Sequence, residues 1–269
     1  EQEKIAEIVS TLDELIQRTD EIIAKTERLK KGIIQELVKK GIGHKEFKET
    51  EIGRIPKDWE VVRLGEVIVS SQSGVWGERV ESSHSYGEVF PAIRSTEIDH
   101  QGNIRLDSEK IAFIKINPKL APKYYLNPGD LLVVRSGGTT GKIILGRVGI
   151  YKNEPNKYLF SNFLLRILVN KEKVSPVFLW YYLNWDVFLT NNIPKLMRKT
   201  IGIQNLPIEK YFAIFIPLPP LSEQEKIAEI LSTVDEKIEI ERKRREKLER
   251  IKKSLMDLLL TGKIRVRID

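Results

Sequence analysis

The same eight residues, EQEKIAEI, occur twice in this chain, at Glu1–Ile8 and again at Glu223–Ile230. The similarity continues beyond them, because VSTLDELIQ after the first copy corresponds to LSTVDEKIE after the second. A repeat of this length indicates a structural unit that is used twice. The fold must therefore accommodate two equivalent segments, one at each end of an intervening domain.

The residues in and after each copy predict a long helix. Apolar side chains recur at three–four spacing, as Ile5, Ile8, Leu12, Leu15, Ile22, Leu29 and Ile33, with Thr19 and Thr26 filling two steps, and as Ile227, Ile230, Val234, Leu248, Ile251, Leu255 and Leu258, with Lys237, Glu241 and Arg244 interrupting. This spacing gives each helix one narrow apolar seam, as in coiled coils. We expect helices of about 35–40 residues within residues 1–42 and 223–269, paired with each other or with a partner chain.

The start of the second helix carries its own signals. Ser222 lies three residues before Glu225, which is the spacing of a capping box. The segment IPLPPLS leads into the second copy, whereas the first copy has no such lead-in and no methionine before it. We therefore expect the natural protein to continue upstream, with another domain that ends in a similar segment.

Residues 43–222 between the helices predict an α+β domain. Short β-branched runs separated by Gly, Pro, Asn and Asp indicate strands, among them WEVVRLGEVIV, GEVFPAIRS, KIAFIKI, GDLLVVRSG, GKIILGRVGIY, NFLLRILVN and YFAIFIPLPP. The run SPVFLWYYLNWDVFLTNN predicts one helix, capped by Ser175 with Pro176 in its first turn. Its apolar side chains are expected in the core.

The charge distribution points to a polyanionic partner. The formal net charge is +7, and residues 115–200 alone contain 14 basic and 4 acidic residues. Such a basic stretch inside a folded domain favours nucleic acid, with a merely basic surface as the alternative. The absence of cysteine excludes disulfides and thiolate metal sites and fits a reducing cytoplasm. No apolar run is long enough to span a bilayer.

A search for catalytic motifs finds none that is complete. The loop SGGTTGKI resembles a nucleotide-binding P-loop, but Ser136 replaces the first glycine and Ile143 follows Lys142 where Ser or Thr is needed. His44, His84 and His100 lack metal-ligand spacing. Asp130 and Glu154 lie among basic residues, where salt bridges are expected. The sequence therefore predicts no catalytic residue, no metal and no cofactor.

Several phrases resemble one known family, the DNA-specificity subunits of type I restriction–modification enzymes. They are TEIGRIPKDWEVVRLGEV at 50–67, PAIRSTEI at 91–98, GDLLVVRSGGTTGKI at 129–143, TIGIQNLPIEKYFAIFIPLPPL at 200–221 and IPLPPLSEQEKIAEIL at 216–231. In that family two target-recognition domains alternate with two long helical spacers. The resemblance implies a first spacer, a recognition domain and a second spacer here, with the two helices in an antiparallel coiled coil whose length sets the distance between half-sites.

The resemblance also implies partners. The family's subunit is not catalytic; it presents double-stranded DNA to modification subunits that carry S-adenosylmethionine and to restriction subunits that hydrolyse ATP and cleave. Self-pairing of this chain, to imitate a two-domain subunit, stays open. The rival interpretations are a protein-interaction scaffold without specific DNA binding, and a methyltransferase fused to a recognition domain.

Base reading requires hydrogen-bonding side chains, and phosphate contacts require Lys and Arg. The candidates lie in the Ser71–Arg79 loop, around Arg94, in the Gly/Thr-rich loop and in the stretch PKLMRKTIGIQN. They are Arg79, Arg94, Ser95, Arg135, Ser136, Thr139, Thr140, Lys142, Lys195, Arg198, Lys199, Gln204 and Asn205. We expect Lys142, Arg198 and Lys199 on phosphates and Arg135 or Gln204 at a base edge, although a buried Arg–carboxylate pair would leave the same sequence pattern.

Overall fold

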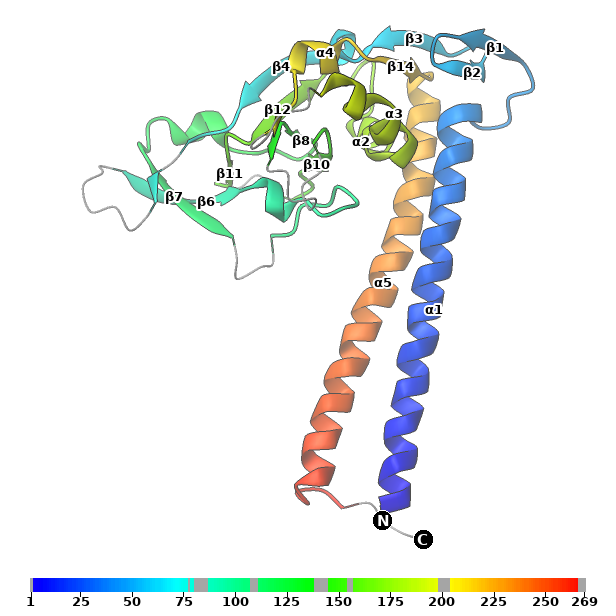
Figure 1. Cartoon of the computed structure of the whole chain (residues 1–269), viewed down its shortest axis with the longest axis vertical. Coiled ribbons are helices and arrows are strands. Elements are labelled where there is room, and N and C mark those ends of the chain that lie inside the picture. The colour runs from blue at the N-terminus through cyan, green and yellow to red at the C-terminus, as the bar shows by residue number, and fades with distance from the viewer. Residues whose placement is uncertain are drawn as a thin grey trace. The chain divides into compact units, whose positions relative to one another are not determined.

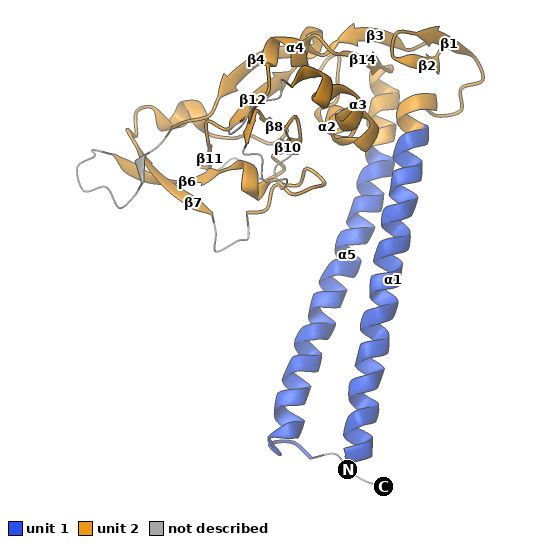
Figure 2. Ribbon diagram, viewed as in Figure 1, with its two compact units in different colours: residues 1–36, 229–269 blue, residues 37–228 orange. Residues whose placement is uncertain are grey.

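The computed structural model describes residues 2–76, 78–79, 87–106, 111–137, 145–153, 157–197 and 204–265. It divides into two compact units, coloured separately in Figure 2. The first unit consists of Glu1–Glu36 and Glu229–Asp269, and the second of Leu37–Ala228. The fold is α+β, as the sequence predicts, and Figure 1 labels its elements.

The first unit is a pair of long helices. Helix α1 spans Gln2–Lys40 and helix α5 spans Leu221–Leu260, so the two contain 39 and 40 residues. Four ion pairs join them: Asp13–Lys252 at 2.5 Å, Asp20–Arg245 at 2.5 Å, Glu27–Arg242 at 2.6 Å and Lys30–Asp235 at 2.6 Å. Along these pairs the residue numbers rise in α1 while they fall in α5. The helices are therefore antiparallel, as the resemblance implies.

The buried face of α1 differs in detail from the predicted seam. Ile22 and Leu29 are 39% and 59% exposed, although both belong to the predicted apolar series. Thr19, Thr26 and Ile33 of the same series stay buried or half-buried, while Ile23 and Lys30 are the less exposed residues beside Ile22 and Leu29. A helix with 3.6 residues per turn drifts relative to a strict 3.5-residue repeat, so neighbouring positions share the interface.

The seam of α5 is partly charged. Ile238 and Leu259 are buried, and Arg245 and Lys252 occupy the two heptad steps between them. Their aliphatic stems cover the seam while their charged ends reach carboxylates of α1. Glu241 is only 5% exposed, so this predicted interruption of the seam is a buried carboxylate.

The core of the second unit is an antiparallel four-stranded sheet in the order β10-β8-β12-β4. These strands span Val148–Ile150, Leu131–Val134, Leu164–Val169 and Ile68–Ser73. All four residues of β8 are buried, as expected for a central strand covered on both faces. Of the predicted strand GKIILGRVGIY, residues 145–147 are not strand and residues 148–150 form β10, while residues 141–144 lie outside the described residues.

A second sheet has the order β11-β6-β7-β5. Its strands span Leu159–Phe160, Glu88–Ile93, Ala112–Ile116 and Glu78–Arg79, with β11 parallel to β6 and the other pairs antiparallel. Its own small core contains Phe90, Ala92, Ile116, Ala121 and Leu159. Two separate cores in one domain leave a junction between sheets at the ends of β4 and β11.

The predicted helix of residues 175–192 is two helices. Helix α2 spans Pro176–Asn184 and α3 spans Asp186–Leu196, with Trp185 in an extended conformation between them. The Ser175 cap is confirmed, because its hydroxyl accepts the N–H of Phe178 at 3.4 Å. The indole of Trp180 donates to the carbonyl of Val148 at 3.0 Å and so ties α2 to β10.

The start of α5 also differs from the prediction. The helix begins at Leu221, and the N–H groups of Glu223 and Gln224 bond the carbonyl of Pro220, so Ser222 lies inside the first turn rather than capping it. The Glu223 carboxylate instead accepts hydrogen bonds from Ile42 N–H, the His44 ring and the Trp59 indole at 2.8–3.0 Å. Glu223 thus joins the chain after α1 to the beginning of α5.

Further short elements belong to the second unit. The hairpin of β1 (Phe47–Thr50) and β2 (Gly53–Pro56) was not predicted from the sequence, nor was the short helix α4 (Ile208–Phe212). Strand β14 (Phe215–Leu218), which the sequence predicts, pairs with β3 (Glu60–Arg63). This pairing sets the point at which the chain leaves the domain and enters α5.

Candidate nucleic-acid interface

A short strand pairing joins two of the predicted DNA-binding segments. Strand β9 (Ser136–Gly137) pairs antiparallel with β13 (Gln204–Asn205), with Asn205 opposite Ser136. The Ser136 hydroxyl donates to Oδ1 of Asn205 at 2.5 Å, and the N–H of Leu206 bonds the carbonyl of Arg135 at 2.7 Å. Residues almost 70 positions apart are thereby brought together, with Ser136 buried and Asn205 exposed.

Arg135 connects this pair to a third predicted segment. Its guanidinium Nη1 donates to Oγ of Ser73, which belongs to the predicted Ser71–Arg79 loop but is the last residue of strand β4. The Arg135 and Ser136 N–H groups both bond the carbonyl of Phe163, at 3.0 and 3.2 Å. We call Ser73, Arg135, Ser136, Gln204 and Asn205 the Arg135 cluster; it combines a guanidinium, hydroxyls and amides, which are the groups that read base edges.

The turn after β11 holds these segments together. The N–H of Val75 bonds the carbonyl of Phe160 at 2.8 Å, and the N–H of Ser161 bonds the carbonyl of Ile93 at 2.8 Å. Ile93 immediately precedes Arg94, so the fourth predicted segment also reaches this turn. The Ser71–Arg79 loop, Arg94 and the Arg135 cluster therefore adjoin residues 160–163.

Arg94 itself is engaged within the protein. Its Nη2 lies 2.9 Å from Oε1 of Glu97, a carboxylate that is only 6% exposed. The hydrogen bond to Glu97 raises the pKa of Arg94. Ser95 begins the 3-10 helix that ends at Glu97. The Arg–carboxylate pairing that the sequence left open is therefore present at Arg94, and its main structural role is to position the end of β6.

The remaining predicted residues are less well connected to the Arg135 cluster. Lys195 is exposed in the last turn of α3, two residues after Ile193, whose side chain packs against Gly146 in the turn before β10. For Arg79 only the backbone is described, in β5 opposite Ile114. Thr139, Thr140, Lys142, Arg198 and Lys199 lie outside the described residues. Their roles stay predictions.

Buried charges near the sheet are structural. Asp130 lies 3.5 Å from Arg166, as its basic surroundings predict, while Glu154 lies outside the described residues. Burial raises the pKa of Asp130, and the N–H of Asn127 and the Arg166 guanidinium act in the opposite direction. Arg166 also donates to the carbonyls of Tyr125 and Lys123 at 2.8 and 3.0 Å. Arg166 is thus a brace between β12 and the loop after β7.

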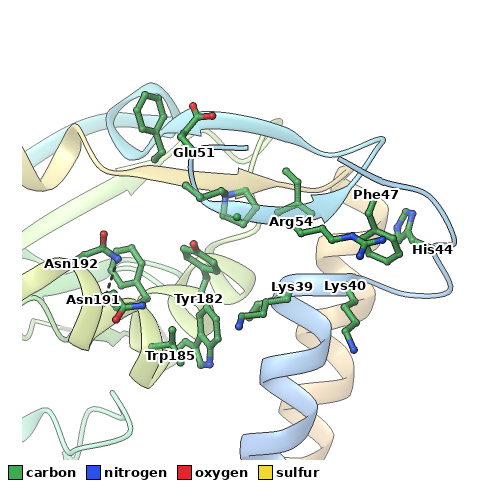
Figure 3. Close-up of a pocket in the computed structure, with 18 residues that line it drawn as sticks. Lys39, Lys40, His44, Phe47, Glu51, Arg54, Tyr182, Trp185, Asn191 and Asn192 are labelled. Atoms are coloured by element: carbon green, nitrogen blue, oxygen red, sulfur yellow. Dashed lines mark hydrogen bonds between the residues drawn. The ribbon is translucent and has the colours of Figure 1, made fainter. Parts of the chain in front are cut away.

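The described part of the second unit has a cavity with a volume of about 840 Å³ (Figure 3). Lys39 Nζ lies 5.4 Å from the centre of the Trp185 ring, and the Arg54 guanidinium lies 5.1 Å from that of Phe47. None of the predicted DNA-binding residues lines this cavity. Its one imidazole, His44, is hydrogen-bonded to Glu223.

No group of three or more His, Cys, Asp or Glu side chains in the described residues is arranged to hold a metal ion. None of the helices in the described ranges has an apolar stretch long enough to cross a bilayer.

Sequence comparison identifies the relatives of this chain. Residues 56–250 match the family described as Type I restriction modification DNA specificity domain. The chain is 36% identical over 276 residues to the Type I restriction enzyme MjaVIII specificity subunit of Methanocaldococcus jannaschii, covering 99% of this chain and 61% of that protein. The chain therefore spans less than two thirds of that relative's length.

Two solved structures are similar in fold. The HsdS subunit from Thermoanaerobacter tengcongensis aligns with a TM-score of 0.52 at 18% identity, over 95% of this chain and 55% of that chain. The type I restriction–modification S subunit from M. genitalium aligns with a TM-score of 0.58 at 14% identity, over 95% and 59%. At such identities the similarity concerns the fold alone.

Proposed function

This chain belongs to the type I restriction–modification DNA specificity family, and from that premise we propose that it reads one half of a two-part site in double-stranded DNA. The supporting observation is the meeting of four separate segments at residues 160–163. Each contributes polar or basic side chains, and none is required there by an apolar core. Such convergence suits a surface that must address several base pairs at once.

Within this surface, we assign base reading to the Arg135 cluster. An arginine can donate two hydrogen bonds to guanine, and the amides of Gln204 and Asn205 can bond adenine in the same way. The strand pairing of β9 with β13 and the bond from Arg135 to Ser73 hold these groups in place before DNA arrives. Binding then costs little ordering of side chains.

Phosphate contacts are assigned to the surrounding lysines and arginines. Lys195 is exposed, and Lys142, Arg198 and Lys199 lie in the same basic stretch of the sequence. These residues fix the position of the domain on the duplex and supply affinity that does not depend on sequence.

For the helix pair we propose a spacing and docking role. Each helix of about 40 residues is roughly 60 Å long, and one added heptad lengthens it by about 10 Å, or roughly three base pairs. In an assembly with two recognition domains, the pair would set the distance between the half-sites. Its charged outer faces would dock modification and restriction subunits in the cytoplasm, and those partners would supply all catalysis.

The experiment is a selection of duplexes from a randomised pool by the 269-residue chain. We expect one short motif to be enriched. Arg135→Ala should relax the selection at one or two positions, whereas the matched control Arg54→Ala, whose guanidinium lies over the Phe47 ring, should leave the motif unchanged. Failure to enrich any motif would instead support the protein-interaction scaffold.

A further inference from the structure

Trp76 differs from the other tryptophans of this protein in its exposure. Trp59 and Trp180 are 0% and 1% exposed, and Trp185 is half-buried, whereas Trp76 is 76% exposed. Among the described residues, Trp76 is the most exposed of the large apolar side chains. Leaving so large an apolar surface in water is unfavourable, so its position invites a functional explanation.

The backbone that carries Trp76 is fixed. A Cβ at Gly74 would lie 2.1 Å from the carbonyl oxygen of Ser161, so only glycine permits this close approach. The next residue, Val75, is held at both backbone groups. Its N–H donates to the carbonyl of Phe160 at 2.8 Å, and the Val75 carbonyl accepts the N–H of Asn162 at 3.1 Å. The backbone immediately before Trp76 is therefore held in place by the residues around it, and the exposed side chain starts from a fixed position.

The indole lies beside the Arg135 cluster. Its ring centre is 6.4 Å from that of Phe163, with an angle of 46° between the planes. The carbonyl of the same Phe163 accepts the N–H groups of Arg135 and Ser136. One short turn thus supports an exposed aromatic ring and a set of base-reading groups at the same time.

We infer that Trp76 places its ring against the bases of the bound DNA, as a wedge or stacking surface at a step next to the bases read by the Arg135 cluster. The inference rests on the proposed function. An apolar ring gains nothing from a phosphate, but it gains from the face of a base or from a partly opened base step. Flexible pyrimidine–purine steps should then be preferred at that position, although no hydrogen bond reads them.

A protein partner is the alternative occupant of the ring. DNA is favoured because Trp76 packs against Phe163, whose carbonyl accepts the N–H groups of Arg135 and Ser136, and because residues 115–200 carry 14 basic against 4 acidic residues. A hydrophobic docking site for a protein would be expected to continue into neighbouring apolar side chains.

The test uses the 269-residue chain and a random-sequence duplex of about 30 base pairs, long enough for several phosphate contacts. On DNA addition we expect Trp76 fluorescence to be quenched and shielded from acrylamide, and both changes to disappear in Trp76→Phe. Trp76→Ala should weaken binding by roughly 5- to 100-fold, the loss that corresponds to one base–aromatic contact. The slope of affinity against salt should stay the same, because no charge is removed. Trp76→Phe should keep most of the affinity.

The control is Phe113→Ala, which removes another exposed aromatic ring, 57% exposed on β7. It should leave DNA affinity unchanged, and circular dichroism should show that both alanine variants are folded. If the unaltered chain binds DNA and Trp76→Ala binds equally well, the inference is overturned while the proposed function stands. If Trp76→Ala binds DNA as tightly as the unaltered chain but no longer binds a modification subunit, the Trp76 ring belongs to a protein contact instead. If the unaltered chain binds no DNA, both fall.

Discussion

The carboxylate of Glu223 accepts a hydrogen bond from the indole of Trp59, with 2.9 Å between Oε2 and Nε1. Glu223 is the first residue of the second EQEKIAEI copy, and Trp59 belongs to the phrase KDWEVVRLGEV that opens the domain. The same carboxylate also bonds the His44 ring and the Ile42 N–H. The repeated phrase therefore has a structural reason to begin with glutamate: it ties the helix to the preceding domain.

Glu223→Ala should lower the stability of the chain, because it leaves the donors of Ile42, His44 and Trp59 without their acceptor. The expected loss is about 1–3 kcal/mol in the free energy of unfolding. Urea denaturation followed by tryptophan fluorescence measures it. Glu225→Ala, which removes an exposed glutamate on the same helix, is the control and should change stability little. Equal effects of the two substitutions would refute the role assigned to Glu223.

Gly41 and Gly43 form a matched pair for testing the space around Glu223. Both have positive φ angles, +64° and +75°, so alanine is strained at either position. At Gly41 a Cβ would also lie 2.4 Å from Glu223 Oε1, whereas at Gly43 it would meet nothing within 4 Å. Gly41→Ala should therefore lower the melting temperature more than Gly43→Ala. A reversed order would contradict the crowding around Glu223.

Glu241 offers a prediction for the helix pair. It is 5% exposed, and its Oε2 has no hydrogen-bond partner in the described residues. Its carboxylate lies 3.1 Å from Lys237 and 3.9 Å from Arg244, but both cations are largely exposed, so the pairing compensates little for burial. Glu241→Leu should raise stability by about 1–4 kcal/mol. Calorimetry measures this change in the free energy of unfolding. Glu239→Leu, at an exposed position of the same helix, is the control and should be nearly neutral. A lower stability of Glu241→Leu would show instead that the carboxylate stabilises the helix pair.

Lys195 tests the phosphate contacts. Lys195→Gln should weaken binding to all duplexes alike and reduce the slope of log affinity against log salt by about 0.9, the effect of one lost phosphate contact. Fluorescence anisotropy at several salt concentrations measures both. Lys57→Gln, which neutralises an exposed lysine paired with Glu46, should leave the slope unchanged. A loss confined to one DNA sequence would place Lys195 at a base instead.

Much of the fold was accessible from the sequence, and the errors have physical causes. The two helices follow from apolar spacing, but the heptad that predicts them placed Ile22 and Leu29 in the seam, whereas the neighbouring Ile23 and Lys30 are the less exposed residues. The helix of residues 175–192 was predicted as one element because no glycine or proline marks the break at Trp185. The β1–β2 hairpin was not predicted because each strand has only four residues and neither contains a run of β-branched residues.

The sequence predicts the individual residues of the candidate site but not their arrangement. Polarity and charge select Arg135, Ser136 and Asn205 one by one, but only the pairing of β9 with β13 shows that they share a surface. Such a pairing across the chain has no local signal in one sequence. Trp76 is selected by neither charge nor polarity; the tryptophan within the loop phrase GVWG is the only hint that the sequence offers.

The central claim is that this domain binds DNA through charge and selects sequence through the Arg135 cluster. The most direct measurement is the affinity of the 269-residue chain for its selected duplex and for a scrambled duplex, each across a range of salt concentrations. We predict parallel lines of log affinity against log salt, with the selected duplex bound more tightly by about tenfold or more, the difference expected for one base-specific contact. Coincident lines, or an affinity that does not respond to salt, would contradict the account.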